Sequence, residues 1–503
     1  MLAIGIAGVV ALASGGGGGG GKSPAHTHAK GGTPAKHSAP QRTQPAAIKG
    51  AINPKVPGLT TFRGNLTRTY YGEGPVPRHP VVKWRYPSTG GMCAQSSDEH
   101  GTETWCGVGW TGQPNVIPHK KGGLLELRFG AYDDHYHFLN ARTGKQIKSD
   151  LVTGDLAKGS ATSDPDGYPL YYAGSRDNDF RIVALDRPQP TVLWSMNADT
   201  TVSNPVWNND WDGAALVVGD YLLEGGENSW FYVVKLNRGY SHGRVSVNPE
   251  IVLTVPSWDD QLSSEFPGTA FSIENSVAYR KGVVYFANSA GLVQGWDISN
   301  VLHGGSNARR VFRFWTGDDT DASVVIDDKG FLYVASELEK YDSRSAEVGQ
   351  LMKLNPFRRN PLVWSVQVRQ QSYDGAGGIW STPALDGGMV YVATNAGGLL
   401  AVDQKSGKVR WKIPLPGPTW SSPVIVDDVL LQGDCSGILH AYDVSRVGHK
   451  PPELWHLKLE GCIEATPAVW RGMIFVGTRG GAMYGIGESA KRAGAGGGRA
   501  GSA

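Results

Sequence analysis

Short apolar segments, each interrupted by polar residues and followed by a glycine-containing turn, recur from about residue 60 to residue 488. Three of them read Trp380-Ser-Thr-Pro-Ala-Leu-Asp386, Trp420-Ser-Ser-Pro-Val-Ile-Val426 and Glu464-Ala-Thr-Pro-Ala-Val-Trp470, at spacings of about 40 residues. Each continues with a turn and a strand-like segment such as Leu399–Asp403, and the first two also have a further segment that contains a tryptophan such as Trp411. The pattern predicts one four-stranded β-sheet per repeat.

Looser copies of the same unit precede these three and bring the predicted total to eight. They begin near Gly109, Lys158, Asp210, Ser272 and Asp321. The last unit has only three predicted strands, at residues 464–470, 473–478 and 482–487. The segment Val81-Val-Lys-Trp84-Arg-Tyr86 has the spelling of the missing outer strand and lies before the first complete unit. We therefore predict an all-β fold, an eight-bladed β-propeller of four-stranded antiparallel blades whose ring is closed by an N-terminal outer strand.

The composition agrees with many short strands and excludes several classes of protein. The 503 residues include 69 Gly and 16 Trp, and only 19% are charged, with a net charge of +2. A chain this apolar and this neutral is neither disordered nor a nucleic-acid-binding polyelectrolyte. Beyond the first residues there is no apolar run long enough for a membrane span, so a polytopic membrane protein is excluded as well.

The two ends of the chain differ from the repeats. Residues 1–14 contain the apolar stretch Leu2–Ala13, which predicts a signal peptide, with a signal anchor as the alternative. Residues 15–49 are rich in Gly, Pro, Ala and His and predict a disordered tether, residues 50–488 form the propeller, and residues 489–503 form a disordered tail. We expect an exported protein at the cell surface, in the periplasm or secreted, whose membrane contact is through the N-terminal segment alone.

The spelling of the repeat resembles a known family. The sequence Ala401-Val-Asp403-Gln-Lys-Ser406-Gly407-Lys408-Val-Arg-Trp411 is similar to the pyrroloquinoline-quinone (PQQ) repeat, and Thr61-Phe62-Arg63-Gly64-Asn65 resembles the segment that precedes the first blade in such proteins. The resemblance implies a propeller fold, which many members keep without the quinone. Its members include quinoprotein alcohol dehydrogenases, which carry two adjacent cysteines, and an outer-membrane assembly lipoprotein, which carries a lipidated N-terminal cysteine. This chain has neither feature, so it resembles uncharacterised exported members more closely.

The chain has four cysteines, Cys93, Cys106, Cys435 and Cys462, none adjacent to another. Four cysteines allow three pairings. Cys93 and Cys106 share one insertion, whereas Cys435 and Cys462 fall at neighbouring points of the last two repeats. We therefore predict the structural disulfides Cys93–Cys106 and Cys435–Cys462, in preference to a redox pair or a zinc site.

Alignment of the repeats predicts which side chains surround the mouth of the central channel. We call this set the rung: Thr111, Lys158, Trp211, Glu274, Asp321, Trp380, Trp420 and Glu464. Aromatic faces beside carboxylates suit a flat or sugar-like ligand, and carboxylates suit a hard cation such as Ca²⁺. The candidate cofactor-binding residues are Lys158, Trp211, Trp380 and Trp420, and the candidate metal ligands are Glu274, Asp321 and Glu464. The alternative is a water-filled funnel without a ligand.

Other polar motifs have structural interpretations. Asp318-Asp319-Thr-Asp321 and Trp258-Asp259-Asp260 lack the spacing of a calcium loop and predict solvated turns. His135 and His137 lie two residues apart without a third ligand and predict surface histidines. Asn178 lies where a tight hairpin needs a residue with positive φ.

The leading hypothesis is an exported, non-catalytic propeller that serves as a binding or scaffold module for a partner protein or a carbohydrate-like ligand at one face of the ring. The alternative is a PQQ- and Ca²⁺-dependent quinoprotein dehydrogenase, in which Asp321 or Glu274 accepts the substrate proton. The missing cysteine pair and the presence of only one rung cation, Lys158, disfavour it. No residue is assigned a catalytic role, and PQQ and Ca²⁺ enter only with the alternative.

Overall fold

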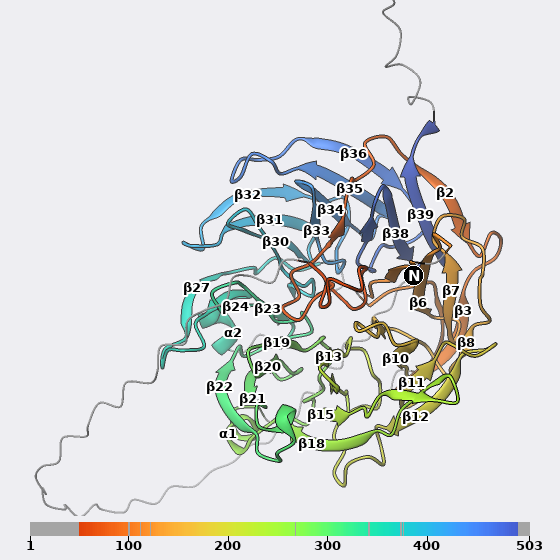
Figure 1. Ribbon diagram of the computed structural model, residues 1–503. Helices are drawn as coiled ribbons and strands as arrows, with labels where there is room; N and C mark the ends of the chain where they lie inside the picture. Colours follow the sequence, from red (N-terminus) through yellow and green to blue (C-terminus); the bar gives the residue numbers. More distant parts are fainter. Residues whose placement is uncertain are drawn as a thin grey trace, which may run out of the picture. The chain divides into compact units, whose positions relative to one another are not determined.

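The computed structural model describes residues 50–490 except 99, 100, 111, 121, 267, 341, 342, 373, 374 and 376. The predicted signal segment and tether, and residues 491–503 of the predicted tail, lie outside the described residues. Eight sheets follow one another around a ring (Figure 1), and we number them as blades 1 to 8 in chain order. The prediction of an eight-bladed propeller of antiparallel blades is confirmed.

Each blade runs from an innermost to an outermost strand. Blades 1 to 4 consist of β5 (Asn115–Pro118), β6 (Leu125–Ala131), β7 (His135–Asn140) and β8 (Leu151–Val152); β9 (Thr162–Ser163), β10 (Leu170–Gly174), β11 (Asp179–Ala184) and β12 (Thr191–Asn197); β13 (Leu216–Val218), β14 (Tyr221–Gly225), β15 (Trp230–Lys235) and β18 (Glu250–Pro256); and β19 (Ala278–Arg280), β20 (Val283–Phe286), β21 (Leu292–Asp297) and β22 (Arg309–Trp315). Blades 5 to 7 consist of β23 (Val325–Ile326), β24 (Leu332–Ala335), β26 (Leu351–Leu354) and β27 (Leu362–Val366); β29 (Ala384–Asp386), β30 (Met389–Thr394), β31 (Gly398–Asp403) and β32 (Val409–Pro414); and β33 (Val424–Val426), β34 (Val429–Gly433), β35 (Ile438–Asp443) and β36 (Glu453–Lys458).

Blade 8 closes the ring. It combines β37 (Ala468–Trp470), β38 (Met473–Thr478) and β39 (Ala482–Glu488) with the N-terminal strands β1 (Gly72–Glu73) and β2 (Pro80–Tyr86). The outer strand β2 pairs antiparallel with β39, and Trp84 packs over Gly485, where a Cβ atom would lie only 2.1 Å from the indole. The predicted closure by Val81–Tyr86 is therefore confirmed, and Gly485 is required for the close approach. The parallel strand β1, which the sequence pattern did not predict, adds a fifth strand inside β37.

Small elements decorate the connections. They are the hairpins β3 (Cys93–Asp98)–β4 (Gly101–Cys106) and β16 (Gly239–Ser241)–β17 (Arg244–Ser246), the pair β25 (Glu337–Leu338)–β28 (Gly377–Gly378), the helices α1 (Asp260–Glu265) and α2 (Ser343–Val348), and the 3₁₀ turn η1 (Val301–His303). Asp259 caps α1 through Leu262 N, so the predicted solvated turn at this position is instead a helix start. Asn178 has φ 76°, which confirms its predicted turn role.

Residues 59–71, which we call the plug, fill the middle of the ring (red in Figure 1). The plug bonds to blades 2, 4 and 5: Ser163 N donates to Thr60 O at 2.7 Å, Tyr279 N to Leu66 O at 2.7 Å, and Ile326 N to Thr67 O at 3.1 Å. Its two arginines, Arg63 and Arg68, are fully buried. The channel is therefore closed by protein at this level.

The two faces of the ring have different connections. The turns between first and second strands and between third and fourth strands form what we call the plug face, because the chain enters there: Asn53 Nδ2 donates to Asp166 Oδ1 at 3.1 Å in the β9–β10 turn. The turns between second and third strands and the connections between blades form the opposite face, which we call the rim face. Within the described residues, no helix is long and apolar enough to cross a membrane.

Candidate functional site

The rung residues lie in the connections that enter each blade on the rim face. In the seven blades whose rung position is described, that position comes four residues before the innermost strand: Lys158, Asp212, Glu274, Asp321, Trp380, Trp420 and Glu464. The prediction placed these side chains on the innermost strands themselves, so the strand starts were predicted too early. Thr111 lies outside the described residues.

Trp211 was placed one position wrongly. Its indole is buried between blades 2 and 3, where it contacts Phe180 and Tyr232, both with ring centroids at 5.6 Å, and donates to Asn178 O at 2.9 Å. The next residue, Asp212, has the rung position. Trp211 therefore belongs to the core, and a carboxylate replaces an aromatic ring at the channel mouth.

Three tryptophans meet at the axis. The rings of Trp380 and Trp420 are 4.6 Å apart, inclined by 31°, and only 7% and 6% exposed. Trp110, which precedes blade 1, reaches across the channel to within 5.8 Å of Trp380. Its φ of 45° is unusual for a bulky residue and directs the ring inward. Sequence alignment missed Trp110 because it lies one residue before the rung position, and no periodic pattern marks such a backbone conformation.

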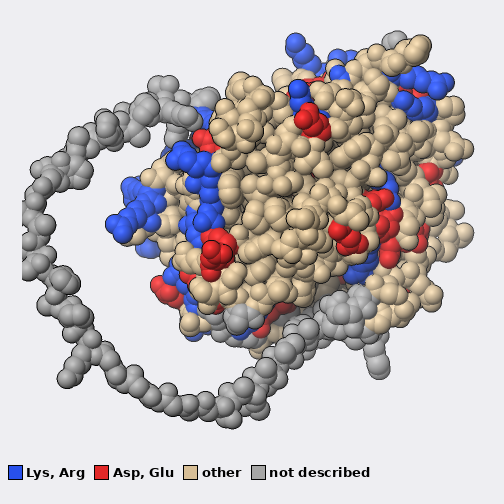
Figure 2. All heavy atoms as spheres, turned by 90° about the horizontal axis from the view of Figure 1, so that it is seen from below, with Lys and Arg blue, Asp and Glu red and all other residues tan. Residues whose placement is uncertain are grey.

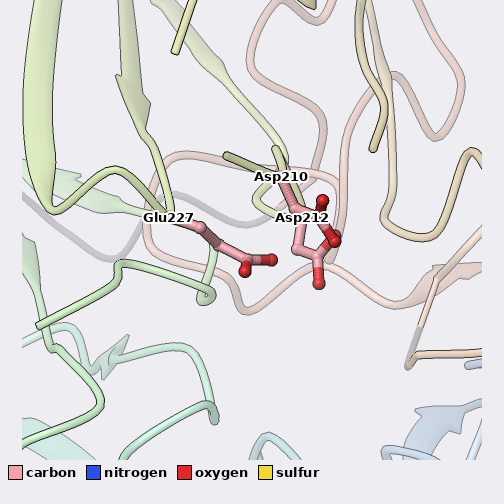
Figure 3. Close-up of side chains that lie close together, drawn as sticks. All are labelled: Asp210, Asp212 and Glu227. Atoms are coloured by element: carbon pink, nitrogen blue, oxygen red, sulfur yellow. The ribbon is translucent and has the colours of Figure 1, made fainter. Parts of the chain in front are cut away.

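Lys158 lies in a cluster of carboxylates that we call site A, composed of Asp210, Asp212 and Glu227 (Figure 3). Lys158 Nζ is 2.8 Å from Asp210, 2.9 Å from Asp212 and 3.5 Å from Glu227. Burial opposes the charged ammonium, but the three carboxylates outweigh burial and raise the pKa of Lys158 well above its usual value. The single rung cation is thus neutralised inside the protein.

A second cluster, which we call site B, combines Glu274, Asp319, Asp321 and Glu337 from blades 4 and 5. One oxygen each from Asp319, Asp321 and Glu337 lies within 4.8 Å of the others. Glu337 is 2% exposed, and its Oε1 and Asp321 Oδ1 have no hydrogen-bond partner among the described residues. Burial raises the pKa of both groups well above the usual range, and burial together with Asp319 raises the pKa of Glu274 to about 7.

Site B has little internal positive charge. Lys340 Nζ contacts Asp319 Oδ2 at 3.1 Å and also donates to Ser289 O at 2.8 Å. Asp318 is fully buried beside the cluster and accepts from Glu339 N and Lys340 N. The predicted solvated turn at residues 318–321 is therefore wrong, because the loop that carries β25 covers it.

Glu464 is separated from the other predicted metal ligands by its own partner. Arg479 Nη1 lies 3.2 Å from Glu464 Oε1, and Trp110 N donates to Glu464 Oε2 at 3.4 Å. The structure therefore brings Glu274 and Asp321 together with Trp380 and Trp420 and leaves Glu464 outside.

A blind cavity connects the tryptophans with site B. It is lined by Trp110, Trp380, Trp420, Asp212, Glu274, Asp321 and, at its floor, Phe62 of the plug. The volume of the cavity is about 20 Å³. That is room for one or two waters, whereas ordinary ligand pockets hold several hundred Å³.

His137 is buried rather than exposed, contrary to the prediction. It is 3% exposed, and its two ring nitrogens lie 3.1 Å from Asp133 and 3.1 Å from Asp150. Burial opposes protonation, but the hydrogen bonds to these carboxylates outweigh it and raise the pKa of His137 to about 9. A buried imidazolium between two carboxylates is a structural ion pair. His135 is half-buried above it.

The two predicted disulfides, Cys93–Cys106 and Cys435–Cys462, are confirmed. The first joins the hairpin β3–β4, whose Trp105 lies between Arg176 and Arg479 at 5.6 and 4.9 Å. The second joins the β34–β35 turn to the connection that enters blade 8. Both therefore stabilise the rim face.

Comparison with known proteins agrees with this geometry. A family described as outer membrane protein assembly factor BamB, whose sequence model is built on PQQ repeats, matches residues 358–450. Solved structures with the same fold include a europium-containing methanol dehydrogenase (15% identity, TM-score 0.53, covering 86% of this chain and 98% of that one). The chain is an eight-bladed β-propeller that resembles the PQQ-repeat family.

Other structural relatives of this PQQ-like propeller are quinohemoprotein alcohol dehydrogenases. The enzyme from Comamonas testosteroni is 12% identical, with a TM-score of 0.54 over 88% of this chain and 82% of that one. The enzyme from Pseudomonas putida HK5 is 12% identical, with a TM-score of 0.55 over 86% and 82%. No curated protein sequence matches the chain. At these identities the likeness establishes the fold alone.

The residues present do not fit PQQ. A tricyclic quinone with three carboxylates needs a flat slot and free cations, whereas the cavity holds about 20 Å³ and Lys158 already faces three carboxylates. Site B does fit a hard cation, because its donor set is all carboxylate and the Oε1 atom of buried Glu337 has no partner within the described chain. The residues of this propeller therefore fit the cation of a quinone–Ca²⁺ site but do not fit the quinone.

Proposed function

We propose that the protein is a non-catalytic binding module of the extracytoplasmic space that binds a partner protein on its rim face. The filled channel carries this proposal: the plug closes one end, and three tryptophans leave a cavity of about 20 Å³ at the other. A substrate and a quinone have no room there, so recognition is left to the surface. The match of residues 358–450 to a family named for an assembly factor supports the same role.

The location follows from the cysteines and the N-terminal sequence. Both disulfides belong to connections of the rim face. Disulfides persist in oxidising compartments, whereas thiols in the cytosol remain reduced. The apolar stretch Leu2–Ala13 supports export. We therefore propose that the propeller lies outside the cytoplasm, at the cell surface, in the periplasm or secreted.

We assign Trp207, on the rim face, to the contact with the partner protein. Its side chain is 54% exposed, and its φ of 82° is strained for a bulky residue. The neighbouring amides fix this conformation, since Val206 N donates to Asn228 O at 3.0 Å and Asn208 N to Glu227 O at 3.3 Å. An aromatic side chain held outward in this way is suited to anchor a protein interface.

The experiment compares two exposed positions in cells. A photoreactive amino acid introduced at Trp207 is expected to crosslink to a defined partner, whereas the same group at Val409, which is 46% exposed on the outer strand β32, is not. With that partner purified, Trp207→Ala is expected to weaken binding at least tenfold, or about 1.4 kcal/mol, without lowering stability. Equal crosslinking from both positions, or unchanged affinity, contradicts the proposal. If an oligosaccharide instead binds with an affinity that depends on Trp207, the ligand is carbohydrate-like and not a protein.

Site B supports a second, separable activity, the binding of Ca²⁺ without quinone. The unpartnered oxygens of Asp321 and Glu337 favour it. Calorimetry with Ca²⁺ is expected to detect one site that Glu337→Gln removes and that Glu347→Gln, an exposed control in α2, retains. Titration with PQQ, with and without Ca²⁺, is expected to leave tryptophan fluorescence unchanged. Quinone binding with alcohol oxidation would instead establish the dehydrogenase.

A further inference from the structure

The plug face carries an exposed aromatic ring within a group of cations. Phe357 is 70% exposed, the highest value among the large hydrophobic side chains that the structure describes. It lies in the turn between β26 and β27, where Phe357 N donates to Asn355 Oδ1 at 3.0 Å and Arg358 N to Asn355 O at 3.2 Å. These bonds hold the turn in shape while the ring points away from the core. The arginines that follow, Arg358 and Arg359, are also exposed.

Neighbouring turns add further cations. The Phe357 ring and Arg280 Nη1 both approach Gly330, where a Cβ atom would lie 3.3 and 3.1 Å from them. Arg280 in turn donates to Asp328 O at 2.7 Å. Residues 279–281, 327–331, 355–361 and 403–408 together contain seven Lys or Arg and three Asp. We call the basic and aromatic members the Phe357 patch: Arg280, Lys281, Lys329, Phe357, Arg358, Arg359, Lys405 and Lys408.

The patch is continuous across three blades. Lys353 lies 4.4 Å from the ring of Phe331 and donates to Gln404 O at 2.9 Å, which joins the turns of blades 5 and 6. In the side view of Figure 2, basic side chains gather in groups separated by broad uncharged areas. The positive charge of the propeller is therefore concentrated locally, although the whole chain has a net charge of only +2.

The patch shares its face with the start of the described chain. Asn53 contacts Asp166 at 3.1 Å, and Val56 lies beside Gly167, in a first-to-second-strand turn equivalent to the one that carries Lys329. The 49 preceding residues include the apolar stretch Leu2–Ala13.

We propose that the Phe357 patch docks the propeller on an anionic lipid surface. Phe357 enters the interface, and the surrounding cations face the lipid phosphates. One exposed ring surrounded by seven Lys or Arg side chains is the composition that suits an anionic lipid surface, because the ring can enter the interface while the cations contact the phosphates. This orientation leaves the rim face directed away from the membrane. The inference does not depend on the function proposed for that face.

The test measures binding of the full-length chain to vesicles by sedimentation. Vesicles of phosphatidylcholine with phosphatidylglycerol are expected to bind the protein more tightly than phosphatidylcholine alone, with a preference that falls as salt rises. The double variant Arg358→Gln/Arg359→Gln is expected to weaken binding to the anionic vesicles about thirtyfold, which corresponds to about 1 kcal/mol for each cation. Phe357→Ser is expected to weaken binding to both kinds of vesicle.

The control variant Arg369→Gln/Lys412→Gln changes the charge equally on the rim side, where both residues are exposed. Because every variant keeps the same N-terminal segment, differences between them report the patch alone. Equal loss in the control and the patch variant, or no preference for anionic vesicles, overturns the proposal. Tight binding of soluble polyglutamate without any binding to vesicles would assign the patch to an acidic protein and overturn it as well.

Discussion

Replacement of Arg68 by methionine is the sharpest test of the plug. Arg68 is fully buried, and its guanidinium donates to three main-chain oxygens: Val277 O at 2.8 Å, Phe62 O at 2.8 Å and Ala214 O at 2.7 Å. A fourth bond reaches Thr61 Oγ1 at 3.1 Å. The single side chain therefore connects the plug with blades 3 and 4.

The size of the effect follows from the acceptors that lose their donor. Each buried polar group left without a partner costs about 1–3 kcal/mol. Three carbonyls therefore cost about 3–6 kcal/mol after some relaxation, with Arg68→Met retaining part of the volume. The variant also removes the positive charge near Glu224, whose pKa burial raises well above its usual range while Arg68 opposes the shift. A domain is stable by about 5–15 kcal/mol in total, so the loss is large.

Urea unfolding followed by tryptophan fluorescence measures the loss as a lower midpoint at an unchanged slope. Arg68→Lys is expected to recover only part of it, because an ammonium cannot reach acceptors on several sides at once. Arg359→Met, which changes an exposed arginine in the same way, is expected to stay within about 0.5 kcal/mol of wild type. A loss below about 1 kcal/mol for Arg68→Met would mean that water replaces the guanidinium and that the plug does not stabilise the ring.

Three further predictions concern the rest of the ring. Trp380→Ala is expected to destabilise the fold by about 3 kcal/mol, because the ring is buried against Trp420, and a smaller loss by calorimetry would show that the channel mouth is solvated. The pKa of His137 is raised from 6.5 to about 9, so its stabilisation is complete below pH 6.5 and is lost as pH rises through 9. That stabilisation is worth about 3 kcal/mol, and His137→Gln should show no such decline in urea midpoints between pH 6 and 10. Peptide mapping without reductant is expected to recover Cys435 with Cys462. The double variant Cys435→Ser/Cys462→Ser is expected to lower the free energy of unfolding by about 3 kcal/mol. A double variant as stable as the wild type would contradict a stabilising role of this disulfide.

The ring was predictable because its signals are local and repeated. Most blades have a tryptophan on the outer strand, so the one incomplete repeat and the unassigned Val81–Tyr86 segment could be matched to each other. Closure needs no knowledge of side-chain contacts, only the rule that an unpaired edge strand is unfavourable. The disulfides followed from the same alignment, since position in the repeat determines position on the ring.

The site was less predictable because two residues of the same type can align in sequence while their backbones place the side chains differently. The run Asp210-Trp211-Asp212 allows more than one alignment to the rung, and the predicted rung has Trp211. The structure has Asp212 there, because Trp211 turns into the core and bonds to Asn178 O. A shift of one residue thus replaces an aromatic face with a carboxylate that holds Lys158.

The plug could not be inferred from its own sequence, because arginines such as Arg63 and Arg68 ordinarily mark a solvated segment. The innermost strands provide the missing reason. In the connections that lead into them, carbonyls such as Thr382 O and Ala214 O have partners outside their own sheets: guanidinium groups of the plug satisfy them at 2.6 and 2.7 Å. These carbonyl oxygens come together around the axis only when the ring is closed, so the need for buried hydrogen-bond donors cannot be seen in the sequence of the plug.

The plug also explains why charge is divided between the two faces. With one end of the channel filled by Phe62 and the arginines, the carboxylates of sites A and B collect at the rim, where one lysine faces three of them. The cations of the Phe357 patch lie on the opposite face, among the turns where the chain enters. The net charge of +2 averages these regions and conceals both. The proposed cation site and the proposed lipid-binding patch thus lie on opposite faces, where the charge of one does not oppose the ligand of the other.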